Sequence, residues 1–186
     1  MGIYQLQGRK ISQSRLHKDL KRDRLRREHD GRFSQRAVLR HRVVHESLRK
    51  GPWRNLVTPY SVGITDAAFY PSMRVESIIK CPQSGATEAV HNCVGYTIDR
   101  PPGPVLYVYP DEATARENAR DRIIPMLRSS PRLREYLTGT SDGMGSLRIK
   151  MSHLTIYMAW SGSAARLGNK PIRYLMLDEL DKYQGT

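Results

Sequence analysis

From residue 53 onward, short apolar runs typical of strands alternate with segments of helical periodicity. Strands that alternate with helices favour a mainly parallel sheet with helices on both faces. Sheets of this kind bind ligands at the carboxyl ends of their strands. We expect strands at residues 75–79, 105–109 and 172–177, and a hairpin formed by residues 147–151 and 154–160.

The clearest helical pattern spans residues 111–128, where an apolar side chain recurs at every fourth residue from Ala115 to Leu127. Glu112 precedes Arg116 by four positions, a spacing that allows an ion pair on the surface of a helix. Further helices are expected at residues 58–68, 85–98 and 131–137, and loops at residues 101–104, 139–145 and 161–169.

Residues 1–50 carry fifteen of the 31 basic residues but only five of the 18 acidic ones, so most of the net charge of +13 lies there. We interpret residues 1–33 as a fraying helix or a tail, and residues 34–49 as a helix that Gly51 and Pro52 end. A basic arm indicates contact with nucleic acid, because each phosphate contact releases counterions. The alternative is a solvated arm without a partner.

Several classes of protein are excluded by composition. Two cysteines, Cys81 and Cys93, are too few for a disulfide scaffold or a four-cysteine zinc site. No run of eighteen apolar residues is present to span a membrane, and no apolar segment follows the basic N-terminus to form a secretory signal. We therefore expect a soluble protein of the cytoplasm with no membrane partner.

Residues 80–88 read Lys-Cys-Pro-Gln-Ser-Gly-Ala-Thr-Glu and lie between an expected strand and an expected helix. Backbone N–H groups of such a loop, together with the positive end of the helix, can bind a phosphate chain. Gly85 allows close approach, and Thr87 offers a hydroxyl to Mg²⁺. Ala86 stands where the usual phosphate loop has its lysine, so Lys80 would supply the cation from the other rim. The alternative is an ordinary glycine turn.

The apolar run at residues 175–177 ends in two acids, Asp178 and Glu179. A strand that ends in this way delivers both carboxylates to the ligand edge of a sheet, on opposite sides of the strand. Asp178 could hold Mg²⁺ through its water shell, and Glu179 could polarise an attacking water. The alternative is a strand that leaves the core into a solvated acidic turn.

Together these segments resemble the ATPase of the large terminase subunit of tailed bacteriophages, specifically the lambda-like gpA family. The displaced lysine of the phosphate loop is the family's own departure from the usual pattern. The resemblance rests on Gly-Pro-Trp53, Thr58-Pro-Tyr60, residues 80–88, residues 95–99, Pro-Gly-Pro104, Tyr109-Pro, residues 115–122, Pro125-Met, and residues 170–179 with Asp181 and Tyr183.

The resemblance implies a P-loop NTPase of the additional-strand, catalytic-glutamate type, a three-layer α/β sandwich that uses ATP and Mg²⁺. It implies a motor that drives duplex DNA into a procapsid, with the small terminase subunit and the portal as partners and a homo-oligomeric ring in the host cytoplasm. The implied site comprises Lys80, Gln83, Ser84, Gly85, Ala86, Thr87 and Glu88 for phosphate, Thr87 and Asp178 for Mg²⁺, Glu179 as catalytic carboxylate, Arg166 toward a neighbour's γ-phosphate, and Trp53 and Tyr60 near the adenine.

Residues 51–186 would then form an incomplete P-loop ATPase domain behind a basic, partly helical arm of residues 1–50. The strands and the nuclease domain that the family places after its acidic strand are missing from the sequence, which ends seven residues after Glu179. We therefore expect a fragment, or a truncated or prophage gene product, that alone is poorly stable and has little ATPase activity. Two alternatives are a helicase-like DExx ATPase fragment and a non-enzymatic basic DNA-binding protein. Trp53 and Tyr60 have an alternative to the adenine role, which is simple packing in the core. The alternative for Arg166 is an ordinary position on the surface.

Overall fold

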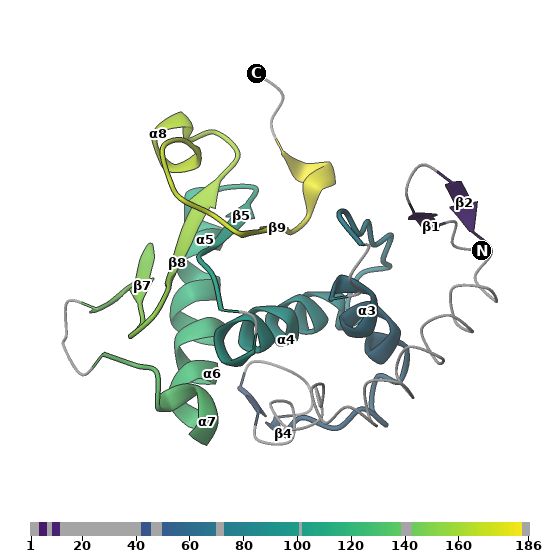
Figure 1. Ribbon diagram of the computed structural model, residues 1–186, viewed down its shortest axis with the longest axis horizontal. Coiled ribbons are helices and arrows are strands. Elements are labelled where there is room, and N and C mark those ends of the chain that lie inside the picture. Colours follow the sequence, from purple (N-terminus) through teal and green to yellow (C-terminus); the bar gives the residue numbers. More distant parts are fainter. Residues whose placement is uncertain are drawn as a thin grey trace. The chain divides into compact units, whose positions relative to one another are not determined.

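The computed structural model describes residues 4–6, 9–11, 42–45, 50–69, 73–100, 102–138 and 143–183 (Figure 1). The chain divides into two compact units. The first unit comprises Met1–Ala37 and Arg54–Cys93, and the second comprises Val38–Trp53 and Val94–Thr186. Among the helices that the structure describes, none is both long and apolar enough to cross a membrane.

The described part of the second unit contains a mixed five-stranded sheet in the order β6-β7-β8-β5-β9. Strand β5 lies parallel to both neighbours, while β6, β7 and β8 pair antiparallel. The expected strand at 105–109, the hairpin and the strand before the acidic pair are thereby confirmed. The strands are β5 (Val105–Tyr109), β6 (Met144–Gly145), β7 (Arg148–Lys150), β8 (Thr155–Trp160) and β9 (Tyr174–Leu177).

The helical segment expected at 111–128 is confirmed, with an irregularity in its middle. It runs as α5 (Glu112–Asn118), a π-helical turn at Ala119–Ile123 and α6 (Ile124–Ser129). Asp111 caps its start by accepting from the Thr114 N–H at 2.8 Å, and the expected Glu112–Arg116 ion pair forms at 2.6 Å. Helix α5 packs on β5 and β8. The repeating residues Ala115, Ala119, Ile123 and Leu127 are all fully buried.

The second unit also has two shorter helices, one before β6 and one between β8 and β9. Pro131 opens α7 (Pro131–Arg134), as its fixed φ favours, although the helix is shorter than expected. The loop expected at 161–169 contains one helical turn, α8 (Ala164–Leu167).

The described part of the first unit contains α3 (Tyr60–Ala68) and a hairpin of β1 (Tyr4–Leu6) with β2 (Arg9–Ile11). The helix expected at 58–68 is confirmed, with Pro59 at its cap position. Helix α4 (Ala86–Asp99), expected at 85–98, begins in the first unit and ends in the second. Its residues 91–98 are all buried.

The strand expected at residues 75–79 is wrong. Residues 73–81 carry no helix or strand, and the side chains of Val75 and Ile79 are exposed. An apolar, β-branched run becomes a strand only where another strand accepts its N–H and C=O groups. The residues described in this unit give the run no such pairing.

The helix expected at residues 34–49 is wrong at the residues of this range that the structure describes. Val43–Val44 form β3 rather than part of a helix, and they pair antiparallel with β4 (Gly51–Pro52). Two adjacent β-branched residues favour extended backbone, and Gly51 supplies a positive φ of 121° on the facing strand. Residues 4–6 and 9–11 are likewise strands instead of a fraying helix or tail. The remainder of 1–41 and residues 46–49 lie outside the described residues.

Candidate functional site

The phosphate loop is a tight turn that runs directly into α4. Gln83 and Gly85 both have positive φ angles, 57° and 76°. Alternation of left- and right-handed backbone is how short loops turn successive N–H groups toward an anion. Gly85 also closes the first turn of α4 by accepting from the Ala89 N–H at 3.2 Å. The loop therefore leads into a helix as expected, whereas the strand expected before it does not form.

Lys80 and Thr87 meet across this loop. The Lys80 Nζ donates to the Thr87 Oγ1 at 2.9 Å, so the cation from the near rim reaches the hydroxyl on the first turn of α4. Lys80 is exposed. The next residue, Glu88, instead pairs within α4, where its Oε1 lies 3.4 Å from the Nδ1 of the buried His91. The structure thus brings together the ammonium and hydroxyl expected to bind phosphate.

The start of α3 lies against the same loop. The Tyr60 hydroxyl donates to the carbonyl of Ser84, and a Cβ placed on Gly85 would lie 3.6 Å from Thr58. Tyr60 is still 53% exposed, so its side chain is accessible to a ligand. Trp53, the other residue expected near adenine, belongs to the second unit, where its ring lies 5.2 Å from the Arg42 guanidinium.

The acidic pair follows β9 at the carboxyl edge of the parallel strands. Asp178 is buried, and its Oδ1 accepts from the Glu179 N–H at 3.1 Å. Glu179 has left-handed backbone, with φ 51° and ψ 48°, an uncommon conformation for a residue other than glycine. Its carboxylate is partly exposed and pairs with Lys182 at 2.9 Å. The two acids therefore have different surroundings, one buried and one at the surface.

Two tyrosines that the sequence analysis did not single out for the site lie near Asp178. Burial raises the pKa of the Tyr109 hydroxyl far above its usual value, and the Asp178 charge adds to the rise. Burial, followed by the charge of Asp178, raises the pKa of Tyr183 to about 12. Both phenols therefore stay neutral beside the carboxylate. The only signal in the sequence was the position of Tyr183, five residues after Asp178.

Arg166 lies on α8, in the connection between β8 and β9, where the sequence placed it. Its guanidinium is 6.0 Å from the ring of Trp160. The Lys170 ammonium donates to the carbonyls of Arg166, of Gly168 at 3.2 Å and of Ala165 at 3.4 Å, which caps this short turn. Arg166 is therefore held on an ordered turn and not on an unstructured loop.

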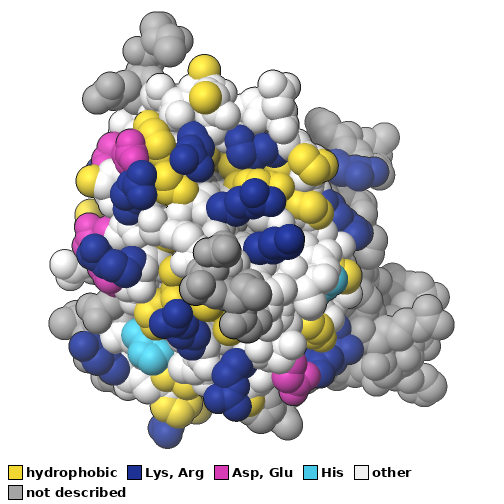
Figure 2. Space-filling model, turned by 90° about the vertical axis from the view of Figure 1, so that its left-hand side faces the viewer, with side chains coloured by type: hydrophobic (Ala, Val, Ile, Leu, Met, Phe, Trp, Pro, Cys, Tyr) yellow, Lys and Arg dark blue, Asp and Glu magenta, His cyan; other side chains and the backbone are white. Residues whose placement is uncertain are grey.

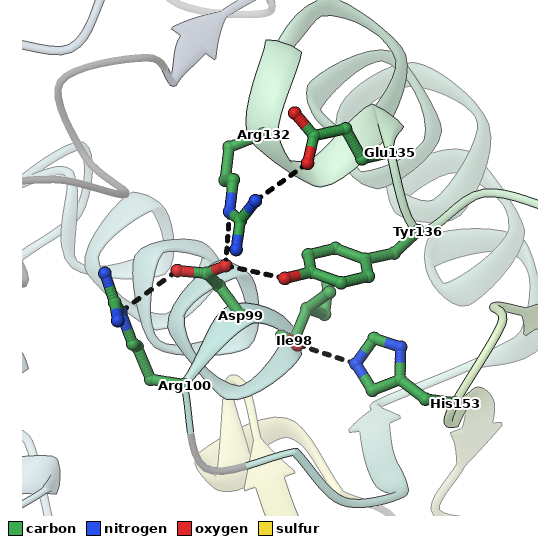
Figure 3. Close-up of polar contacts among 7 residues, drawn as sticks. All are labelled: Ile98, Asp99, Arg100, Arg132, Glu135, Tyr136 and His153. Atoms are coloured by element: carbon green, nitrogen blue, oxygen red, sulfur yellow. Dashed lines mark hydrogen bonds and ion pairs between the residues drawn. The ribbon is translucent and has the colours of Figure 1, made fainter.

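The far end of α4 is fixed by a polar network within the second unit (Figure 3). The Asp99 side chain is only 1% exposed, and it accepts from the Arg132 Nε at 2.6 Å and from the Tyr136 hydroxyl at 2.9 Å. His153 bonds the carbonyl of Ile98 at 2.7 Å. Because α4 begins at the phosphate loop, these contacts hold the opposite end of the helix whose N-terminus forms the candidate site.

The candidate residues thus form two groups, the loop residues with Tyr60 in the first unit and the acidic pair with Arg166 in the second. Among the described residues, no cluster of three or more His, Cys, Asp or Glu side chains could hold a metal ion. Thr87 and Asp178 as joint Mg²⁺ ligands therefore stay a prediction. Figure 2 shows one face on which Lys and Arg side chains are more widespread than Asp and Glu.

A known protein family matches most of the chain. The family described as phage terminase large subunit gpA, ATPase domain, matches residues 47–186. Comparison with curated proteins and with solved structures finds no match to the chain. The matched range covers most of the chain and includes both the phosphate loop and the acidic pair.

Proposed function

Because the chain belongs to the family of phage terminase large subunit gpA ATPase domains, we propose that it is the ATP-hydrolysing motor part of a terminase large subunit. In this role it powers the packaging of duplex DNA into procapsids. The observation that carries the proposal is the phosphate loop, in which the Lys80 ammonium lies 2.9 Å from the Thr87 hydroxyl at the start of α4. An ammonium, a hydroxyl and a helix N-terminus together are the donors that a triphosphate requires.

ATP would be held mainly by backbone. The loop residues Gln83, Ser84, Gly85 and Ala86 would direct N–H groups at the phosphates, followed by Thr87 and Glu88 on the first turn of the helix. Lys80 would offset charge on the β- and γ-phosphates. The exposed ring of Tyr60 is suited to stack on adenine, and Trp53 is proposed as a second adenine contact.

The donor set also suits Mg²⁺, which favours one or two protein oxygens together with substrate phosphate and water. The Thr87 hydroxyl and the Asp178 carboxylate are the proposed ligands. Mg²⁺, when bound, neutralises charge that develops on the phosphates. Asp178 is buried, and its Oδ1 accepts from the Glu179 N–H at 3.1 Å, so the turn itself orients this carboxylate.

Glu179 is the proposed catalytic carboxylate, which orients and polarises the attacking water. Its present partner is Lys182, in a pair whose two side chains are 37% and 59% exposed. An ion pair at that exposure contributes at most about 1 kcal/mol, so Glu179 can exchange Lys182 for a water at little cost. Arg166 is proposed to reach the γ-phosphate bound by a neighbouring subunit in a homo-oligomeric ring, since a guanidinium stays charged and binds phosphate bidentately.

The fold is proposed to be the additional-strand, catalytic-glutamate form of the P-loop NTPase. The arrangement that supports it is β5 lying parallel between β8 and the strand that delivers the acidic pair. Duplex DNA, the small terminase subunit and the portal of the procapsid are the proposed partners. Within residues 1–50, basic side chains outnumber acidic ones, and this excess supports the DNA contact.

The proposal is tested by nucleotide binding and single-turnover hydrolysis with Mg²⁺ present, because single turnovers register even slow chemistry. Lys80→Ala should lose nucleotide binding, while Glu179→Gln should bind ATP and not hydrolyse it. Lys150→Ala, which removes an exposed lysine on β7, is the matched control and should behave as the unaltered chain. Full hydrolysis by Glu179→Gln, or ATP binding unaffected in Lys80→Ala, would refute these assignments. DNA affinity that is steeply salt-dependent in a chain that binds no ATP would favour a non-enzymatic DNA-binding protein.

A further inference from the structure

The turn after β9 is closed by one of its own side chains. The N–H of Asp178 donates to the carbonyl of Val108 at 3.1 Å, which continues the pairing of β9 with β5. The hydroxyl of Tyr183 donates to the same carbonyl at 2.9 Å. Residues 178–183 therefore leave the sheet at Val108 and return to it at the same atom.

The Tyr183 ring also contributes packing to this closure. It lies on the buried cluster of Leu106, Val108 and Ala159, which are each at most 3% exposed. The ring therefore stays on the sheet through apolar contact, and the hydroxyl is aimed by that contact. Burial and the nearby charge of Asp178 raise the pKa of this phenol to about 12, so it remains a hydrogen-bond donor at neutral pH.

Between the two anchors, the backbone follows a defined path. Glu179 has left-handed backbone, and the Lys182 N–H donates to the Glu179 carbonyl at 2.9 Å in a 3-10 turn at Leu180–Lys182. A left-handed residue with a side chain costs about 1–2 kcal/mol and persists only where the surroundings impose it. The Tyr183 anchor is a contact that can impose it, because it fixes where the turn must end.

We propose that Tyr183 is a positioning residue for hydrolysis, an inference that rests on the function proposed above. Its bond to the Val108 carbonyl holds the turn that directs the Glu179 carboxylate. Asp178 keeps its own N–H bond to the same carbonyl. Tyr183 does not touch the nucleotide in this scheme. Its loss should therefore affect the chemical step and leave nucleotide affinity unchanged.

The test compares Tyr183→Phe with Tyr157→Phe in the complete chain. Both variants remove one hydroxyl and keep a ring that packs on the same buried cluster. The bond to the strand carbonyl is lost in Tyr183→Phe alone. The single-turnover rate at saturating Mg²⁺–ATP should fall about tenfold in Tyr183→Phe, the effect of one lost hydrogen bond combined with a misdirected carboxylate. The dissociation constant for ATP should stay within about twofold, and Tyr157→Phe should retain the unaltered rate.

Three results would overturn the inference. The first is an unaltered rate in Tyr183→Phe. The second is a rate and an ATP affinity that fall together. The third is loss of the folded circular dichroism spectrum in Tyr183→Phe, which would assign the hydroxyl a general structural role. A failure of the proposed function is distinguishable, because the unaltered chain and both variants would then bind no ATP.

Discussion

The network around Asp99 gives a quantitative prediction for stability. Asp99→Asn keeps the shape of the side chain and removes the charge that pairs with Arg132 at 2.6 Å and Arg100 at 3.1 Å and accepts from Tyr136 at 2.9 Å. The asparagine side chain also has an NH₂ group, a donor, in place of one carboxylate oxygen that accepted from these partners. Hydrogen bonds to a charged group contribute about 1.5–3 kcal/mol each, and the loss of a buried carboxylate costs about 3–5 kcal/mol. Arg132 is 46% exposed and can be solvated by water afterwards, so we expect a loss near the lower end, about 2–3 kcal/mol.

Tryptophan fluorescence is the suitable assay, because both tryptophans of the chain, Trp53 and Trp160, belong to the unit that contains Asp99. Urea unfolding followed in this way should show the loss as a lower midpoint with an unchanged slope. In thermal unfolding, a chain of this size should lose about 2–4 °C for each kcal/mol.

A double-mutant cycle isolates the contribution of Tyr136 from those of Arg100 and Arg132, the other partners of Asp99. Tyr136→Phe alone should cost about 1 kcal/mol, and it should cost almost nothing in the Asp99→Asn background. Asp121→Asn is the control, since it removes an exposed carboxylate that pairs with Arg120 at the surface, and it should leave the midpoint unchanged. If Asp99→Asn unfolds within about 0.5 kcal/mol of the unaltered chain, the network does not stabilise the fold and the reasoning is wrong.

Three further predictions concern the first unit. Burial raises the pKa of Glu76 from 4.5 to about 8, so protonation of Glu76 stabilises the fold fully below pH 4.5, and this stabilisation is lost as the pH rises to 8. Unfolding followed by circular dichroism should show the free energy of unfolding falling by up to about 1.4 kcal/mol per pH unit over that window. Glu76→Gln should flatten this fall. Gly85→Ala has room for its methyl group but must hold φ at 76°, so it should cost about 1–2 kcal/mol of stability and weaken ATP binding in a fluorescence titration. Cys81 is exposed and Cys93 buried, so a maleimide should label one site by mass spectrometry, and ATP should slow that labelling if the loop binds phosphate. Equal labelling of both cysteines would contradict the burial that the structure assigns to α4.

Local periodicity was sufficient to predict the elements for which several local signals agree. The strand at Val105–Tyr109 and the long helix after Asp111 were predictable because an apolar run marks the first, and a four-residue apolar repeat and the Glu112–Arg116 spacing mark the second. Residues 75–79 have an equally good strand pattern and form none. An apolar run specifies a preference for extended backbone, whereas a strand also needs an available edge, which no local pattern reports.

The candidate site shows the same division. The loop and the acidic pair could be identified because spacing within a short segment predicts which backbone and side-chain groups are adjacent. The roles of Tyr183 and Asp99 could not, because each depends on where a side chain folds back onto a residue far away in sequence. Tyr183 reaches Val108, 75 positions earlier, and Arg132 reaches Asp99 across 33 positions.

The π-helical turn at Ala119–Ile123 has a consequence for how this chain can vary. Residues spaced by four advance about 40° too far around a regular helix at each step, since one turn takes about 3.6 residues. Three such steps from Ala115 to Leu127 would carry the last side chain about a third of the way around the axis, yet all four are fully buried. The wider turn resets the phase of the stripe. Removal of a single residue between 119 and 123 should therefore give a regular helix that keeps Leu127 in the interior, because apolar spacings of four, three and four residues stay within about 60° of one another. Related chains that lack the extra residue should show these spacings.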